Sequence, residues 1–103
     1  MLSLKTVFTT LKSDCQAQFL RTEDLSEAGY LFHRFRLCKD LDIIVHFDLE
    51  KNLVEGVESV DEFDWDNDRG ILGFSLQSKA DLIAFCLKAM DRQLRSRLSP
   101  EEE

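Results

Sequence analysis

Residues 41–49 alternate between apolar and other side chains more regularly than any other stretch of the chain. One parity of this stretch is entirely apolar: Leu41, Ile43, Val45, Phe47 and Leu49. The other parity holds Asp42, Ile44, His46 and Asp48. A period of two residues indicates a β-strand with one buried face. This strand is the clearest element that the sequence predicts.

The preceding stretch, residues 30–38, is predicted to pair with this strand in one of two registers. A two-residue turn at Lys39-Asp40 would set Arg34 and Arg36 against apolar residues and bury two guanidinium groups. An odd-length loop instead sets Leu37 opposite Ile43. Since a slip of one residue turns every side chain to the other face, we predict the second register. The core face would then hold Leu31, Phe35, Leu37, Ile43, Val45, Phe47 and Leu49, and the outer face Tyr30, Phe32, Arg34, Arg36, Asp42, Ile44, His46 and Asp48.

The remaining elements follow from periodicity and from capping residues. Apolar residues at helical spacing predict an amphipathic helix over 4–20 with Ser3 as its N-cap, followed by a polar connection that closes at Gly29. Strands are predicted over 53–60, with a bulge at Gly56, and over 70–76. Ser78 and Asp81 are placed to cap a second helix, whose apolar face would hold Leu82, Ile83, Phe85, Cys86, Leu87, Ala89, Met90 and Leu94. Ser99-Pro100 would end it.

These elements predict an α+β fold: a two-layer domain in which a four-stranded antiparallel meander lies between an N-terminal and a C-terminal helix. A chain of 103 residues has room for one core. We therefore assign residues 1–98 to a single domain and residues 99–103 to a frayed acidic tail. Two helices side by side cover one face of such a sheet and leave the other free.

The stretch from Asp61 to Gly70 is the strongest functional feature. It contains Asp61, Glu62, Phe63, Asp64, Trp65, Asp66 and Asp68, and the fold is expected to bring Glu58 or Asp48 near them. Like charges repel and resist burial, so we expect a solvated loop. Aromatic residues among carboxylates suggest a surface that binds a basic partner.

The acidic residues are unevenly distributed. Residues 40–68 hold eleven acidic residues and one lysine, a net charge of −10, whereas the remainder holds nine acidic and twelve basic residues, a net charge of +3. Such a field attracts cationic partners and repels nucleic acid and anionic membranes, so neither is an expected partner. A net charge of −7 also arises from selection for solubility alone, and this alternative stays open.

A metal site is not expected. The Asp64-x-Asp66-x-Asp68 spacing matches the start of an EF-hand calcium loop, but Arg69 stands where the loop needs glycine and Ser75 where it needs glutamate. No other metal, phosphate or cofactor motif is present.

Catalysis is not expected either. The two histidines, His33 and His46, fall on opposite faces of the predicted sheet. Cys38 is only loosely placed to pair with His46, and no oxyanion hole is evident. The cysteine count of three is odd, which favours reduced thiols in a cytoplasmic setting. No signal peptide or membrane span is predicted.

The outer sheet face is a second candidate surface, because it carries Tyr30, Phe32 and Ile44. Either Arg34 and Arg36 lie over these residues and shield them, or the residues form a partner or self-association patch.

Three functions are compatible with these features. The leading hypothesis is a small acidic protein that neutralises a basic protein, such as an immunity protein or inhibitor that blocks a toxin nuclease. An adaptor or homodimeric accessory subunit that uses the sheet face is the alternative. A small enzyme or calcium sensor is less favoured.

Overall fold

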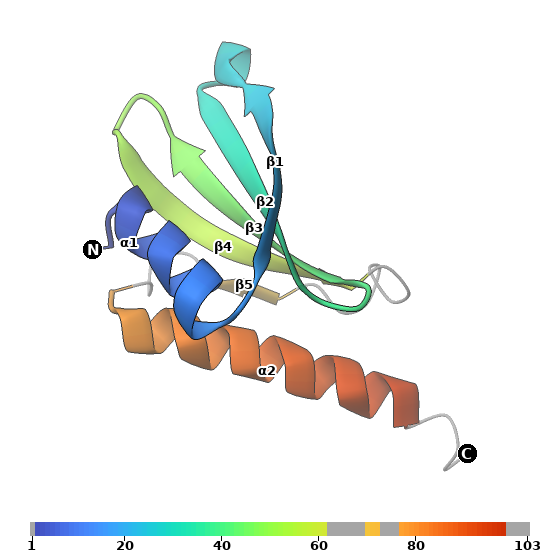
Figure 1. Ribbon diagram of the computed structural model, residues 1–103. Helices are drawn as coiled ribbons and strands as arrows, with labels where there is room; N and C mark the ends of the chain where they lie inside the picture. The colour runs from blue at the N-terminus through green and yellow to red at the C-terminus, as the bar shows by residue number, and fades with distance from the viewer. Residues whose placement is uncertain (1, 62–69, 73–76, 99–103) are drawn as a thin grey trace.

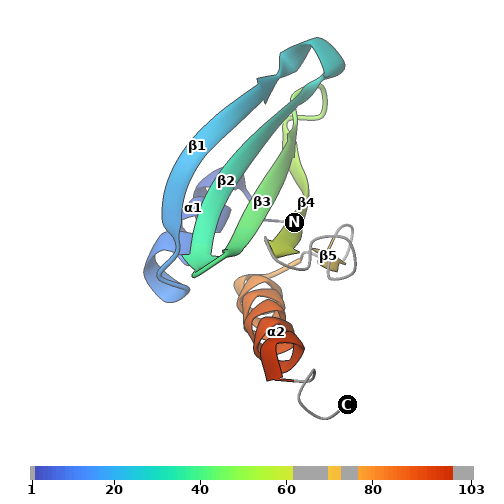
Figure 2. The ribbon, with the colours of Figure 1, turned by 90° about the vertical axis from the view of Figure 1, so that its right-hand side faces the viewer.

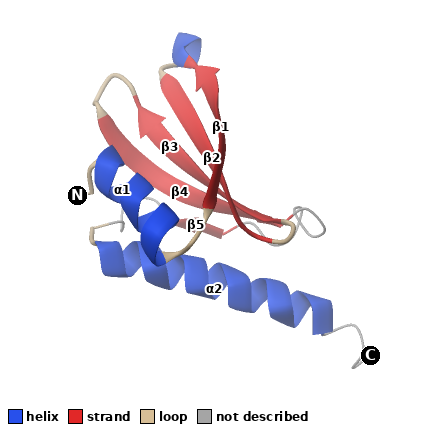
Figure 3. Cartoon of the chain, viewed as in Figure 1, coloured by secondary structure: helices blue, strands red, loops and turns tan. Residues whose placement is uncertain are grey.

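The computed structural model describes residues 2–61, 70–72 and 77–98. Figures 1 and 3 show an N-terminal and a C-terminal helix beside a curved sheet. The N-terminal region is α1 (Leu4–Thr9), continued by a π-helical turn η1 (Thr10–Asp14). The strands are β1 (Gln18–Leu25), β2 (Tyr30–Cys38), β3 (Leu41–Asp48), β4 (Leu53–Asp61) and β5 (Gly70–Leu72), with a short 3-10 helix η2 (Ser26–Ala28) before β2. Helix α2 (Lys79–Leu98) follows.

The five strands lie in the order β1-β2-β3-β4-β5, and each is antiparallel to its neighbours. Figure 2 shows the first four side by side, with α1 behind them and α2 below. Residues from α1, η1, α2 and the sheet form one core cluster, so both helical regions pack on the inner face of the sheet. The predicted α+β meander between two helices is confirmed, and the sheet has one additional strand, β1.

The first helix is shorter than predicted, and the residues after it form β1. The helix loosens in η1, where the Cys15 amide donates to the Thr10 carbonyl over five residues. Gln16 then adopts a left-handed conformation with φ of 56° and ends the helix. Prediction of a helix to residue 20 was wrong because pairing with β2 outweighs the local helix propensity of Gln16-Ala17-Gln18.

The β2–β3 hairpin has the predicted facing but not the predicted register. Phe35, not Leu37, pairs with Ile43, and Cys38 pairs with Leu41 across a two-residue turn. The register shifts between Arg36 and Cys38. This irregularity adds one residue to β2, so a short turn and a buried apolar face become compatible.

Other local predictions are confirmed. The register of β3 and β4 shifts beside Gly56, as a bulge there requires. The Ser3 hydroxyl accepts the Thr6 amide at 3.1 Å at the start of α1. Ser78 and Asp81 form a reciprocal capping box at α2, with N–O distances of 3.2 and 3.1 Å.

The core lies between the inner sheet face and the helices. Its fully buried apolar side chains include Val7, Leu11, Phe35, Ile43, Val45 and Leu82. Three residues predicted to be buried are exposed instead, namely Leu49, Leu87 and Leu94. Leu49 lies beyond the end of β3, and the two leucines of α2 lie away from its buried residues Leu82, Cys86 and Ala89. Neither described helix is long and apolar enough to cross a membrane.

Candidate functional site

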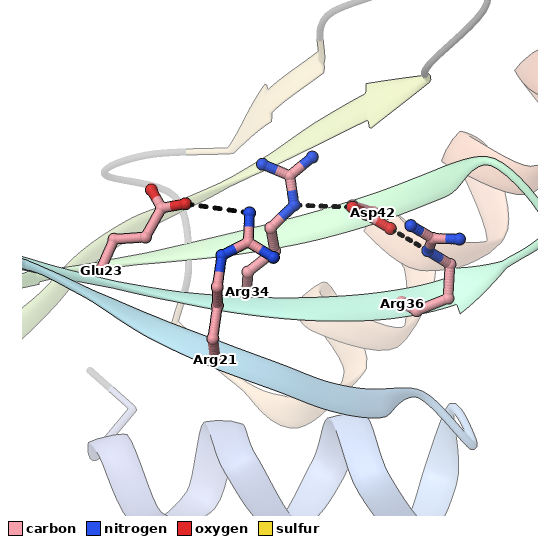
Figure 4. Close-up of polar contacts among 5 residues, drawn as sticks. All are labelled: Arg21, Glu23, Arg34, Arg36 and Asp42. Atoms are coloured by element: carbon pink, nitrogen blue, oxygen red, sulfur yellow. Dashed lines mark hydrogen bonds and ion pairs between the residues drawn. The ribbon is translucent and has the colours of Figure 1, made fainter.

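A cluster of three charged residues lies on the outer sheet face (Figure 4). Asp42 on β3 is only 1% exposed and accepts hydrogen bonds from the Nε atoms of Arg34 and Arg36 on β2. The Arg34–Asp42 distance is 2.6 Å. Arg36 is directly opposite Asp42 in the ladder, and Arg34 is opposite the next-but-one residue, Ile44. The two guanidinium groups therefore neutralise and cover a carboxylate that would otherwise be buried without a partner.

Beside this cluster, aromatic rings cover part of the same face. His46 stacks on Phe32 with ring centroids 4.3 Å apart, and Tyr30 lies next to Phe32. His46 Nε2 is 3.0 Å from Glu58 Oε1 on β4. Ile44 is only 8% exposed, so at this residue the structure favours shielding, the first of the two alternatives, over an exposed patch. Its neighbours across the ladders, Arg34 and Glu58, are long enough to shield it. Both arginines bind Asp42.

Three acidic residues predicted to bind a partner are buried. Asp48 is 6% exposed and accepts the Lys51 amide at 3.0 Å, which closes the β3–β4 turn. Glu58 is 6% exposed beside His46, and Asp61 is 0% exposed at the end of β4. These three carboxylates present little surface to a partner, and those of Asp48 and Glu58 make contacts within the sheet instead.

The other predicted contact residues, Glu62, Phe63, Asp64, Trp65, Asp66 and Asp68, lie outside the described residues. The structure does show where this segment starts. Asp61 pairs with Leu41, the first residue after the Lys39-Asp40 turn. The last described residue before the acidic segment therefore lies at the end of the sheet where β2 and β3 are joined.

His33 and His46 lie on opposite faces, as predicted. His33 is 7% exposed on the inner face, where its ring packs edge-on against Phe8. Its Nδ1 lies 2.8 Å from the Thr22 hydroxyl, and its Nε2 has no partner among the described residues. Burial lowers the pKa of His33. His33 is thus a side chain of the core, packed against Phe8.

The lowered pKa of His33 predicts a pH dependence of stability. His33 binds a proton less tightly in the folded protein than in the unfolded chain, so its contribution to stability is complete above the ordinary histidine pKa of ~6.5. This contribution is lost as the pH falls from about 6.5 through the lowered pKa of the folded state. We expect the urea midpoint to fall between pH 7.5 and 5.5 by more in the wild type than in His33→Gln, which does not titrate. Equal losses in the two proteins would contradict this assignment.

Two cysteines meet inside the fold. Cys15 after η1 and Cys86 on α2 are within hydrogen-bonding distance, and burial raises the pKa of both thiols. Cys38 Sγ instead lies 3.4 Å from Gln93 Oε1. Within residues 2–61, 70–72 and 77–98, no group of three or more metal-ligating side chains comes together.

A shallow groove of about 540 Å³ runs along α1. Its described lining residues are Leu4, Lys5, Phe8, Thr9, Lys12 and Ser13. The titratable residues of this lining are Lys5 and Lys12.

Comparisons of the chain with protein-family models, curated proteins and solved structures found no match. The charged cluster around Asp42 was not predicted, although all three residues were assigned to the outer face. The predicted register set Arg36 against Ile44, whereas the observed register sets it against Asp42. The sequence contains no residue that marks the register shift between Arg36 and Cys38, so the pairing of Arg36 with Asp42 was not predicted.

Proposed function

We propose that this protein binds a basic macromolecule, most simply a basic protein, through the acidic and aromatic segment 62–69. An inhibitor or immunity protein that occupies the cleft of a nuclease is the form of this function that fits best. A nuclease cleft is basic because it holds phosphates, so carboxylates attract it and aromatic residues anchor to it. In this proposal the protein itself catalyses no reaction. The proposal also assumes that the protein and its target are both in the cytoplasm.

The burial of the β3–β4 acids is the observation that carries the proposal. Four carboxylates of the acidic region, on Asp42, Asp48, Glu58 and Asp61, are at most 6% exposed and present little surface to a partner. In this proposal the contacts come from the remaining acidic residues of the region. Residues 62–68 contain four of these, spaced around Phe63 and Trp65. The proposal therefore concentrates recognition at the end of the sheet where β4 stops.

A second candidate function is an adaptor that uses the outer sheet face. The half-buried rings of Tyr30 and Phe32 support it, because neither helical region packs on this side. The exposed apolar area is small once Ile44 is excluded. We therefore rank it below the acidic segment.

Capture of partners from cells of the source organism tests the proposal. The test variant carries Asp64→Asn, Asp66→Asn and Asp68→Asn. A matched control carries Glu27→Gln, Glu50→Gln and Glu55→Gln, which remove the same charge from other partly or fully exposed sites. We expect wild type and control to retain one basic protein that high salt releases, and the test variant to lose it. Equal capture by all three would refute the acidic segment as the recognition element.

Trp65 is predicted to be the main anchor. Binding energy usually concentrates in a few aromatic or arginine residues, so Trp65→Ala should weaken binding by roughly 2 kcal/mol. Isothermal titration with the captured partner measures this loss, and a thermal melt of the free variant checks its stability. Should Trp65→Ala lower the melting temperature and leave affinity unchanged, Trp65 supports the fold instead of the interface.

A further inference from the structure

The outer edge of β1 is an unpartnered sheet edge. Among the described residues, β1 pairs only with β2, so its other side presents free backbone amides and carbonyls. Natural sheet edges are usually protected by charged side chains, lysine above all, and by proline, short length or bulges. β1 carries three charged residues, Arg21, Glu23 and Asp24, which keep the edge from pairing with strands that do not match these charges. β1 is eight residues long and contains neither proline nor lysine. Its one irregularity lies near its start, between Phe19 and Arg21.

The side chains of β1 are complementary to a second copy of the same strand. Arg21 and Glu23 both lie on the outer face (Figure 4), with Nη2 and Oε2 3.2 Å apart and with 56% and 39% of their side chains exposed. Thr22 between them faces inward, beside His33. In an antiparallel pair centred on Thr22, Arg21 is opposite Glu23 of the second copy and Glu23 is opposite its Arg21. Residues opposite each other share a face, so both charge pairs form together.

We propose that two copies of this chain associate through β1, antiparallel and centred on Thr22, to form one continuous sheet of ten strands. The contact is isologous, since the same residues serve on both sides. Opposite charges and a Thr–Thr pair directly across the two strands stabilise this register. The interface leaves the start of the acidic segment free, because β4 lies three strands away. This proposal does not depend on the proposed function.

Another self-association surface is available on α2. Leu87 and Leu94 are each 58% exposed and lie two turns apart on one side of that helix. Asp91 and Arg95 pair at 2.9 Å within α2, as Arg21 and Glu23 pair at 3.2 Å within β1, so charge alone does not separate the two surfaces. Among the described residues the β1 edge also offers unpaired backbone groups, so it is the favoured surface.

Charge reversal distinguishes the two surfaces in analytical ultracentrifugation. Wild type should dimerise reversibly as its concentration is raised. Arg21→Glu and Glu23→Arg each place like charges across the interface and should weaken the dimer roughly tenfold or more. An equimolar mixture of these two variants restores both charge pairs, so it should form a heterodimer. The double variant R21E/E23R should regain the homodimer.

The controls decide the outcome. Arg95→Glu reverses an exposed charge on α2 and should leave the dimer unchanged. Circular dichroism of each variant verifies that it is folded. A wild type that stays monomeric up to about 0.5 mM overturns the proposal. The proposal is also overturned if Arg21→Glu and Glu23→Arg both still dimerise while L87K/L94K is monomeric, because the interface then lies on α2.

Discussion

Val45→Asp is expected to prevent folding. Val45 is 0% exposed in the middle of β3, between His33 on β2 and Val57 on β4. An aspartate there is buried without a partner, or is protonated at the cost of a raised pKa. The loss of several kcal/mol is comparable to the roughly 5–15 kcal/mol that stabilises a typical domain. Far-ultraviolet circular dichroism and urea titration measure the result.

Two further aspartate substitutions define how specific that result is. Leu25→Asp, at a residue 42% exposed on β1, should leave the protein folded with little loss of stability. His46→Asp looks harmless from the alternation of β3 alone. The structure predicts a measurable loss, because the new carboxylate faces Glu58 and the stacking on Phe32 disappears. A folded, stable Val45→Asp protein would contradict the assignment of β3 to the core.

The buried face of β3 was predictable because burial of one face produces an alternation of two residues in the sequence. Ile43 and Val45 are fully buried and β3 has no proline or glycine, so their alternation with other residues survives in the primary structure. Helix caps were predictable for a similar reason. Ser3 and Ser78 satisfy backbone amides within three residues, so their signal is local.

β1 was not predictable in the same way. It is an edge strand with most of its side chains exposed, so neither a buried face nor an alternating pattern marks it. Its stability comes from pairing with β2, and the pairs at its start join residues distant in the sequence, such as Phe19 and Phe35. The apolar residues Cys15 and Phe19 also continue the helical spacing of α1. Contacts distant in sequence override that local pattern.

The acidic contact residues were predicted from charge, and charge does not reveal burial. In the sequence, nothing separates the buried acids Asp42, Glu58 and Asp61 from the exposed acids around them. Their burial follows from the position of each in the β-ladder. That position depends on two irregularities, before Cys38 and beside Gly56. A shift of one residue changes which side chains face each other. In the sequence, only the irregularity beside Gly56 is marked by a glycine.

Removal of both arginines from Asp42 should cost about 3–5 kcal/mol of stability, because it leaves a buried carboxylate without a cation. The substitutions are Arg34→Gln and Arg36→Gln. Either alone should cost much less, since the other guanidinium still bonds the carboxylate and is 20% or 36% exposed to water. The double loss should therefore exceed the sum of the single losses. Urea unfolding of the four proteins at pH 7 measures this coupling.

The triple variant Arg34→Gln, Arg36→Gln, Asp42→Asn separates the charge of Asp42 from its packing. With the carboxylate replaced by a neutral amide of similar shape, the penalty for a buried charge disappears, so the triple variant should be more stable than the double. Arg21→Gln is the matched control, because Arg21 lies on the same face but binds Glu23 in the exposed pair. Its loss should stay below about 1 kcal/mol. If the double and triple variants unfold at the same urea concentration, the arginines act by covering Ile44 and the strand rather than by neutralising Asp42.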